Sequence, residues 1–576
     1  MRKRVSLKTV TIIDILEAIN KDYGDITAVQ IREKDGTFRK ISYVELGRRT
    51  VDVSSNLIKW GIVQNDRIAI YSENRPEWSV ALFGIICAAA IVVPIDIKLS
   101  ETEVQFILSN SQARCIFVSE KYLNIVDKIK PSLPDLKYII AIDNNERQDV
   151  VKLKDLKLVS EENKNRPIHE EDTALIIYTS GTTGVAKGVE LTYRNLMFQV
   201  RSLSEIVHYK IQEQFLSILP LNHTLELTGG LIAPLYAGGC ITYCDSLKPT
   251  HMLSLMQQTH TRMVICVPLV IKMLYDGVMD KVDKMPAYKR KMFNRLLNLS
   301  KWLLNYNIRI GRLLFFELHK QFGSKLCGFV SGGAPLDKEI EINFSALGFW
   351  VLQGYGLTET SPAIAVNTFE TYRFGSVGKP LLGVEVKILK ENSSSNDGEI
   401  ITRGDHVMKG YFQNPGQTAE VIKEGWLHTG DIGRLDNDGF LYITGRIRNL
   451  IVLGAGKKVF PEEVEQVISR SPFIKEICVL AKIATKGLRK GCEEVYAVVV
   501  PNLDLFEESE KKDKNAIKNK INSEIARLVT NLAEYKRVID FEIWADELPK
   551  TASRKIKRKV IADIITSASH CENKEI

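Results

Sequence analysis

The sequence predicts an α/β protein with at least two domains, and three observations carry this prediction. The chain has 576 residues, of which 45% are hydrophobic and 26% charged, a globular composition at a length that exceeds one core. Short Val/Ile-rich runs alternate with helix-like stretches through about the first 270 residues. After Pro380 the texture changes to short strands separated by turn-forming sequences.

The alternating part predicts buried parallel strands covered by helices. The expected strands are RIAIYS, IVVPID, RCIFVS, KYIIAID and TALIIYT. After Pro380 the strands VEVKILK, GEIITRG and GFLYITG predict a β-rich subdomain. From about Arg448 strands and helices return, including a lysine-rich helix near KNAIKNKINSEIARLV, in a final block of common domain size.

These elements predict a domain organisation. A large N-terminal domain of mixed and parallel sheets with flanking helices is expected over 1–447, and its β-rich subdomain over about 380–447. A small, mobile α+β C-terminal domain is expected over 448–576.

The apolar segments of the chain indicate neither a membrane-spanning nor a secreted protein. The N-terminal stretch begins with a basic cluster, but Asp14 and Glu17 interrupt its apolar part, so an amphipathic helix is expected rather than a signal peptide. The longest apolar run, Val80 to Ile95, is shorter than a membrane span and is closed by Pro94. It predicts a buried helix that leads into a buried strand.

The nine cysteines are scattered along the chain. Their closest pair, Cys240 and Cys244, lacks the second pair or the histidines that a zinc site requires. They are therefore interpreted as reduced core residues of a cytosolic protein.

The positive charge is concentrated in one segment. The chain carries a net charge of +8, and 281–325 alone carries +9, from eleven Lys/Arg against Asp283 and Glu317. Within it FNRLLNLSKWLL places five apolar residues near one helical face: Phe293, Leu296, Leu297, Leu303 and Leu304. A basic amphipathic helix can lie on an anionic membrane surface, and the alternative is a solvated helix docked on its own domain. The expected location is cytoplasmic, or peripheral on the inner face of a membrane. Nucleic acid is not an expected partner.

The stretch YTSGTTGVAKGV, Tyr178 to Val189, predicts a phosphate-binding loop. A Walker A loop requires lysine directly after its last glycine, whereas Lys187 precedes Gly188, so this is not a Walker loop. Glycines free the backbone to wrap around an anion, hydroxyl and N–H groups donate, and a lysine supplies a cation. The candidate residues are Thr179, Ser180, Gly181, Thr182, Thr183, Gly184 and Lys187.

This arrangement resembles the signature of the adenylate-forming (AMP-binding) superfamily, and further motifs follow in that family's order. LPLNHTLELTGG resembles the segment in which fatty acyl-CoA synthetases show H-x-x-E, here His223 and Glu226, and it implies a histidine near the substrate carboxylate. A structural role for His223 is the alternative. The glycines of TGGLIAPLYAGG either line a tunnel for the substrate or serve helix packing.

Two motifs imply nucleotide contacts. SGGAPL is similar to the family's turn along the adenine, with Gly333, Ala334 and Pro335, unless it is a simple helix entry. GYGLTET resembles the motif whose aromatic residue, here Tyr355, stacks on the adenine, followed by Gly356 and Thr358. Glu359 is implied to hold Mg²⁺ as a hard oxygen ligand, together with Thr179.

The C-terminal motifs complete the resemblance. GWLHTGDIGRLDNDGFLYITGRIRNLI implies that Asp431 accepts hydrogen bonds from the ribose hydroxyls and that Arg446 contacts the nucleotide. LPKTASRKIKRKV places Lys555 on the family's catalytic lysine, with Arg554 where glycine is usual. A basic tail is the alternative for that segment.

The family's reaction implies movement. A carboxylate attacks the α-phosphate of Mg-ATP, pyrophosphate leaves, and a thiol then displaces AMP from the acyl-adenylate. The small domain is implied to pivot near Arg448, withdraw Lys555 and bring forward the thiol-tunnel loop with Gly454 and Gly456.

The implied activity is that of a long-chain fatty acid–CoA ligase, because the H-x-x-E pattern and the basic insertion resemble those enzymes. The implied partners are a fatty acid, ATP with Mg²⁺, and CoA. The alternatives are transfer to the phosphopantetheine arm of an acyl carrier protein and a non-catalytic lipid-sensing protein.

Overall fold

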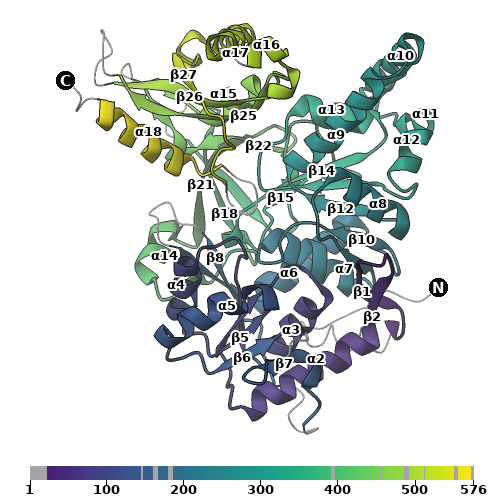
Figure 1. Ribbon diagram of the computed structural model, residues 1–576, viewed down its shortest axis with the longest axis vertical. Helices are drawn as coiled ribbons and strands as arrows, with labels where there is room; N and C mark the ends of the chain where they lie inside the picture. Colours follow the sequence, from purple (N-terminus) through teal and green to yellow (C-terminus); the bar gives the residue numbers. More distant parts are fainter. Residues whose placement is uncertain are drawn as a thin grey trace. The chain divides into compact units, whose positions relative to one another are not determined.

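The computed structural model divides the chain into two compact units (Figure 1). Unit 1 contains residues 1–386 and 402–427, and unit 2 contains residues 387–401 and 428–576. The structure describes residues 23–143, 147–159, 166–179, 186–390, 396–453, 457–484, 492–511, 513–550 and 556–572. Among these described residues no helix is long and apolar enough to cross a membrane.

An eight-stranded sheet in unit 1 has the order β19-β9-β8-β4-β3-β5-β6-β7. Its strands from β8 to β7 run parallel, while β9 and β19 continue it antiparallel. Its strands are β3 (Arg67–Tyr71), β4 (Ile91–Pro94), β5 (Cys115–Val118), β6 (Tyr138–Ala141), β7 (Val151–Lys152), β8 (Thr173–Thr179), β9 (Lys187–Thr192) and β19 (Gly410–Tyr411). All five strands expected in the first part of the chain are present here.

Both faces of this sheet are covered, because alternate side chains of β3 enter different cores. Ile68 and Ile70 join a core with α2 and α3, whereas Ala69 and Tyr71 join a core with α4 and α5. These helices are α2 (Tyr43–Lys59), α3 (Pro76–Cys87), α4 (Glu101–Ser111) and α5 (Glu120–Ile129). Every residue of α3 is buried, so the predicted helix leading into a buried strand is confirmed.

A nine-stranded sheet in unit 1 has the order β16-β15-β14-β13-β12-β10-β11-β1-β2. Its strands are β1 (Thr27–Arg32), β2 (Phe38–Ser42), β10 (Gln214–Ser217), β11 (Cys240–Tyr243), β12 (Met263–Cys266), β13 (Gly328–Ser331), β14 (Trp350–Tyr355), β15 (Ala365–Val366) and β16 (Lys379–Pro380). The strands from β14 to β1 are parallel, and their side chains form one core with the α2–α3 side of the first sheet.

Helices connect the strands of this second sheet. They are α6 (Tyr193–Val207), the π-helix η4 (Leu225–Ile232), α7 (Ala233–Tyr236), α8 (Pro249–Thr259), α9 (Pro268–Asp283), α10 (Ala287–Leu304), α11 (Gly311–Leu314), α12 (Phe316–Gln321) and α13 (Lys338–Ala346). The helix α14 (Pro415–Val421) follows β19. Figure 1 shows α10 extending outward from the helices of its own unit, beyond α9 and α13.

A five-stranded sheet occupies the region after Pro380, as expected for a β-rich segment. It contains β17 (Glu385–Leu389), β18 (Gly398–Arg403), β20 (Ile422–Lys423), β21 (Trp426–Leu435) and β22 (Leu441–Arg446). The division into two units passes through this sheet, at residues 386/387, 401/402 and 427/428. The predicted domain boundary at 447/448 concerns movement and stays a prediction.

The rest of unit 2 is an α+β structure. It contains β23 (Ile451–Val452), β24 (Lys458–Val459), α15 (Pro461–Ile468), β25 (Ile474–Ile483), β26 (Glu493–Pro501), α16 (Glu508–Lys511), α17 (Lys514–Leu528), β27 (Asp540–Ile543) and α18 (Arg558–Glu572). The predicted lysine-rich helix is α17, which buries Ile517, Ile521 and Ile525. The eight cysteines whose side chains the structure describes form no disulfide, and six of them are buried, in agreement with a role in the core.

Candidate functional site

Three of the predicted motifs follow strands that end at the same edge of the nine-stranded sheet. Strands β10, β12, β13 and β14 are parallel neighbours, so their carboxyl ends meet at one edge. The His223 segment follows β10, the 331–335 turn follows β13, and 354–360 follows β14. Ligands of open α/β sheets bind at this edge, so the topology brings the His223 segment together with two loops that follow it by more than 100 residues.

The 331–335 turn lies against its neighbours through a glycine. A Cβ added to Gly332 would lie 3.1 Å from Leu225 Cδ2 and 3.7 Å from the Gly354 carbonyl oxygen. Gly333 has φ +83°, a conformation that favours glycine, and the next residues, Ala334 and Pro335, are exposed. The helix α13 begins shortly afterwards, with Asp337 accepting from the Glu339 and Ile340 N–H groups. The turn is thus a helix entry that also contacts the end of β14.

The aromatic motif follows directly. Tyr355 ends β14 and is half-buried. A Cβ on Gly356 would lie only 1.8 Å from the Pro362 carbonyl oxygen, so the main chain requires glycine there. Thr358 then opens the 3₁₀ turn η5 (Thr358–Thr360), in which the Thr360 hydroxyl accepts from the Leu357 N–H (2.8 Å).

A cation, an aromatic ring and a carboxylate lie next to one another in space beside this turn. The Tyr411 hydroxyl donates to Glu359 Oε1 (2.9 Å), and Lys187 Nζ lies over the Tyr411 ring, 5.1 Å from its centroid. Tyr411 reaches this place because β19 pairs with β9, which places Tyr411 opposite Val189. Lys187 and Glu359, predicted from distant motifs, are therefore neighbours of one side chain.

Two strands flank the predicted phosphate loop, and the first of them, β8, is the expected TALIIYT strand. Thr179 ends β8 and lies opposite Lys187, which begins β9. The predicted loop residues between them, Ser180, Gly181, Thr182, Thr183 and Gly184, lie outside the described residues. At the start of β9, Lys187 lines a pocket together with Ala186, Gly188 and Phe412.

His223 stands at the start of the π-helix η4, and Glu226 lies in its first turn. The Leu227 N–H donates to the His223 carbonyl oxygen (3.0 Å). Glu226 is fully buried, and burial raises the pKa of its carboxyl to about 8. A Cβ on Gly230 would lie 2.5 Å from Glu226 Oε1, and one on Gly229 2.8 Å from Ile265 Cδ1. These glycines therefore serve packing, one of the two interpretations that the sequence allowed.

Asp431 and Arg446 belong to unit 2, where they face each other across strands β21 and β22. Arg446 Nε lies 2.6 Å from Asp431 Oδ1, and the Asp431 side chain is only 3% exposed while that of Arg446 is 50% exposed. The Asp431 N–H donates to the Thr429 hydroxyl, which donates to the Ile400 carbonyl oxygen (2.7 Å). These bonds fix the backbone that carries the carboxylate.

The remaining predicted residues are placed only in part. Arg448 lies exposed in the 3₁₀ turn η6 (Ile447–Asn449). Lys555, Gly454 and Gly456 lie outside the described residues. On the two sides of Lys555, Lys550 and Ile556 pair as an isolated bridge, and the Lys557 N–H donates to the Pro549 carbonyl oxygen (2.8 Å).

Sequence reasoning missed Tyr411. It lies in a strand of only two residues, which has no periodicity to detect, and its role depends on pairing with β9. The only signal is its place in the aromatic dipeptide of KGYFQNP, which is weak without the pairing.

The fold and these loops define an α/β protein whose polar and aromatic side chains gather at the carboxyl edge of a parallel sheet, as in nucleotide-binding enzymes. A family model described as AMP-binding enzyme matches residues 16–412, and one described as AMP-binding enzyme C-terminal domain matches residues 463–555. The chain therefore belongs to the AMP-binding enzyme family.

Several relatives match over most of their length. The chain is 27% identical to the long-chain-fatty-acid–CoA ligase FadD15 of Mycobacterium bovis, with 92% of each chain covered. It is 31% identical to fatty acyl-CoA synthetase A of Dictyostelium discoideum, covering 87% of this chain and 78% of the relative.

Solved structures share the fold. The anthranilate CoA ligase AuaEII in complex with anthranoyl-AMP matches with a TM-score of 0.79 at 21% identity, covering 99% of this chain and 100% of that one. A fatty acyl CoA synthetase of Mycobacterium tuberculosis matches with a TM-score of 0.67 at 22% identity, covering 97% and 99%.

Proposed function

We propose that this protein activates a long-chain fatty acid with ATP, forms an acyl-adenylate, and transfers the acyl group to the thiol of CoA with release of AMP and pyrophosphate. The observation that carries the proposal is the convergence of Lys187, Tyr411 and Glu359 in a member of the AMP-binding enzyme family. Relatives named as long-chain fatty acid–CoA ligases cover nearly the whole chain and support the choice of substrates.

The phosphates are assigned to the β8–β9 hairpin and to Glu359. Lys187 supplies a cation at the start of β9, and Thr179 supplies a hydroxyl at the end of β8. The Glu359 carboxylate is a hard oxygen ligand that suits Mg²⁺, which takes one or two protein carboxylates and completes its shell with phosphates and water. Bound there, Mg²⁺ would neutralise charge on the triphosphate. Tyr411 orients Glu359 through its hydroxyl.

The nucleoside is assigned to two places. The turn with Gly333, Ala334 and Pro335 and the segment with Tyr355, Gly356 and Thr358 form the adenine site in unit 1. Asp431 is assigned to the ribose hydroxyls and Arg446 to the nucleotide in unit 2. The Arg446 guanidinium is half-exposed and carries five N–H donors, so it suits a nucleotide oxygen as well as Asp431.

The chemistry is assigned to Lys555, as stabiliser of the charge that builds on the α-phosphate, and to His223 beside the carboxylate. Arg448 is the proposed pivot, and the loop with Gly454 and Gly456 the proposed thiol tunnel. A cytoplasmic location, with peripheral contact of 281–325 with a membrane, remains part of this proposal.

The experiment is an assay of pyrophosphate release with saturated fatty acids of increasing chain length, with CoA present and absent. Release that depends on a long-chain acid and turns over with CoA is expected. Lys555→Ala should abolish adenylate formation and spare thioester formation from supplied acyl-AMP. The absence of fatty acid-dependent ATP–pyrophosphate exchange would contradict the proposal, and equal loss in both half-reactions would make Lys555 structural.

An acyl carrier protein as acceptor is the second candidate. It is favoured by a relative named long-chain-fatty-acid–[acyl-carrier-protein] ligase AEE15 of Arabidopsis thaliana, 26% identical over 88% of this chain. Thioester formation with a carrier protein but not with CoA would replace the CoA proposal.

A further inference from the structure

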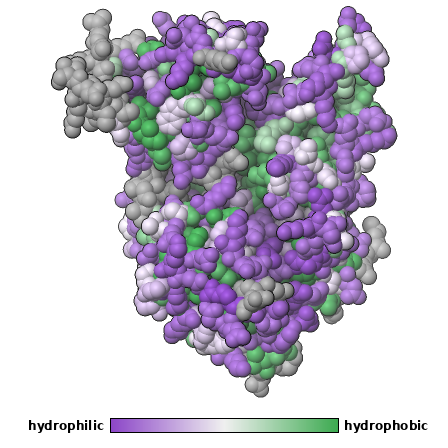
Figure 2. All heavy atoms as spheres, viewed as in Figure 1, coloured by the Kyte–Doolittle hydropathy of each residue, from purple (hydrophilic) through white to green (hydrophobic). Residues whose placement is uncertain are grey.

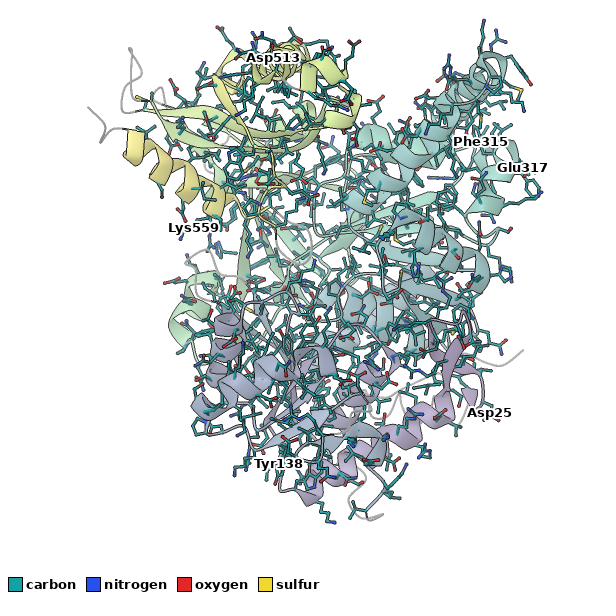
Figure 3. The ribbon with its side chains drawn as sticks, in the orientation of Figure 1. Asp25, Tyr138, Phe315, Glu317, Asp513 and Lys559 are labelled. Atoms are coloured by element: carbon teal, nitrogen blue, oxygen red, sulfur yellow. The ribbon has the colours of Figure 1, made fainter. Side chains whose placement is uncertain are left out.

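Helix α10 is bound to its own unit by one face. Leu297, Ser300 and Leu304 are buried there, and the Ser300 hydroxyl donates to the Ala346 carbonyl oxygen (2.7 Å). Phe293 packs against Phe315, with ring centroids 5.0 Å apart; Phe315, labelled in Figure 3, directly precedes α12. This face contains the apolar residues that the sequence placed together, so for these residues the docked-helix interpretation is correct.

The opposite face of α10 is a second apolar stripe. Tyr288, Met292, Arg295, Leu299 and Trp302 follow one another at spacings of four, three, four and three, which places them on one side of a helix. Tyr306, four residues further on, continues the series just beyond the helix end and packs against Trp302, with centroids 5.1 Å apart. The exposed fractions of the apolar members are 69% for Tyr288, 58% for Met292, 44% for Leu299, 55% for Trp302 and 62% for Tyr306.

Exposed apolar side chains are also present in the segments that flank α10. Four more large hydrophobic side chains are exposed in the flanking segments: Met285, Ile308, Leu313 and Phe316. In Figure 2 the arm formed by α10 carries apolar residues among hydrophilic ones. Several large apolar side chains exposed on one face of a helix indicate an interaction site rather than scattered exposure.

Positive charge surrounds the stripe. Segment 281–325 carries +9, and of its two acidic residues Glu317 points outward in Figure 3 and pairs only with Lys320 in the described part of the chain. Within the described residues, Lys289, Lys291 and Arg295 take part in no ion pair. All residues from 283 to 292 are exposed, so the first turns of α10 stand clear of the fold.

We propose that this face of α10, with Tyr288, Met292, Leu299, Trp302 and Tyr306 as its apolar members, docks the protein onto an anionic lipid bilayer. Tyrosine and tryptophan suit the boundary between headgroups and hydrocarbon, and lysine and arginine bind anionic headgroups while their stems lie along apolar surface. Charge complementarity selects this occupant over a second copy of the chain, because two faces of +9 segments would repel each other. The proposal rests on the membrane contact of 281–325 that is part of the proposed function and deepens it, but its test does not use the ligase activity, so the two can fail separately.

The test is flotation of the full-length protein with two kinds of vesicle. One contains phosphatidylcholine alone, and the other contains phosphatidylcholine with ~30% phosphatidylglycerol as the anionic lipid. Binding to the anionic vesicles is expected at low salt, with weakening at about 1 M salt, where the screening length falls to roughly 3 Å. Each basic residue near an anionic surface raises the affinity by about tenfold or less. The variant Lys289→Glu/Lys291→Glu/Arg295→Glu should bind the anionic vesicles ~100-fold more weakly. Its matched control is Lys34→Glu/Lys59→Glu/Lys137→Glu, three exposed lysines of unit 1 outside the arm, which should bind like the unaltered protein.

A second variant tests the apolar part. Tyr288→Ser/Met292→Ser/Trp302→Ser should lose anionic-vesicle binding while its thermal unfolding stays unchanged, because these side chains are exposed. Val63→Ser/Leu505→Ser/Ile539→Ser is the apolar control. Trp302→Phe should keep binding but lose most of the blue shift of tryptophan emission on vesicle addition.

Three outcomes would overturn the proposal. These are failure to float with anionic vesicles, equal binding by both charge variants, and conversion of a dimer to a monomer by the apolar variant, which would mean that a second copy covers the face.

Discussion

The two ends of the unit 1 site hold their carboxyl groups in opposite ways. Glu359 is half-exposed and hydrogen-bonded to Tyr411, beside the cation of Lys187. Glu226 is fully buried in the π-helix, with neither carboxyl oxygen in a geometrically good hydrogen bond within the described residues, and its pKa is raised to about 8 by burial. A partly exposed, oriented carboxylate serves a charged ligand, whereas a buried neutral acid serves the shape of the segment that contains it. Substitutions at Glu359 should therefore change activity, and substitutions at Glu226 should change stability.

The largest effect on activity is expected from Glu359→Gln. The amide keeps an oxygen that accepts from Tyr411 but loses the negative charge that would hold Mg²⁺, so ATP–pyrophosphate exchange should fall roughly 1000-fold, or about 4 kcal/mol. The urea midpoint of unfolding should stay unchanged. A variant with full exchange activity would remove Glu359 from the phosphate site.

Glu226→Gln should have a large effect on stability that depends on pH. The carboxyl has an ordinary pKa of 4.5 and a folded-state pKa of about 8, so the folded state binds the proton more tightly. Ionising this buried carboxyl destabilises the folded state. The destabilisation is absent below pH 4.5, grows as the pH rises towards 8, and is then constant. The free energy of unfolding of the Gln variant should therefore rise relative to that of the unaltered protein by about 1.4 kcal/mol for each pH unit within that window. Urea unfolding of both proteins from pH 5 to 9 measures the difference, and a pH-independent difference would show that Glu226 titrates normally.

Gly230→Ala tests the same segment by shape. The new methyl group would lie 2.5 Å from Glu226 Oε1, so a loss of ~3 kcal/mol in the free energy of unfolding is expected. Gly277→Ala in α9 is the matched control, because nothing lies within 4 Å of its added Cβ and alanine favours a helix by about 0.5–1 kcal/mol. Adding Glu226→Ala to Gly230→Ala should restore part of the loss. Additive effects would mean that the two residues do not compete for space.

The smallest effect is expected from Tyr411→Phe. The ring stays beneath Lys187, and the hydrogen bond to Glu359 is lost. A loss of roughly tenfold in exchange activity is expected, from a charged hydrogen bond of about 1.5 kcal/mol. Exchange kinetics over a range of MgATP concentrations provide the measurement, and a loss as large as that of Glu359→Gln would assign Tyr411 a direct contact with the nucleotide.

The sequence was a good guide where local pattern determines structure. The buried strands and the strands that flank the phosphate loop have strong hydrophobic signals, and all are present. The contact of Tyr411 with Glu359 was not predictable, because it depends on the pairing of a two-residue strand with β9. The second face of α10 was also missed, because Tyr288 and Trp302 lie among charged residues and look polar on average. In both cases the decisive information is which surfaces the fold leaves open.

The π-helix has a consequence for how this segment can change. Its hydrogen bonds span five residues instead of four, so Leu225–Ile232 accommodates one residue more than an α-helix of the same length would. Removing one residue between 227 and 230 would leave a helix of ordinary pitch, and Glu226 would keep about the same direction relative to Ile232 and α7, because the wider turn and the extra residue would be lost together. Homologues with and without that residue would then be interconvertible by a single codon, with the buried acid kept in place.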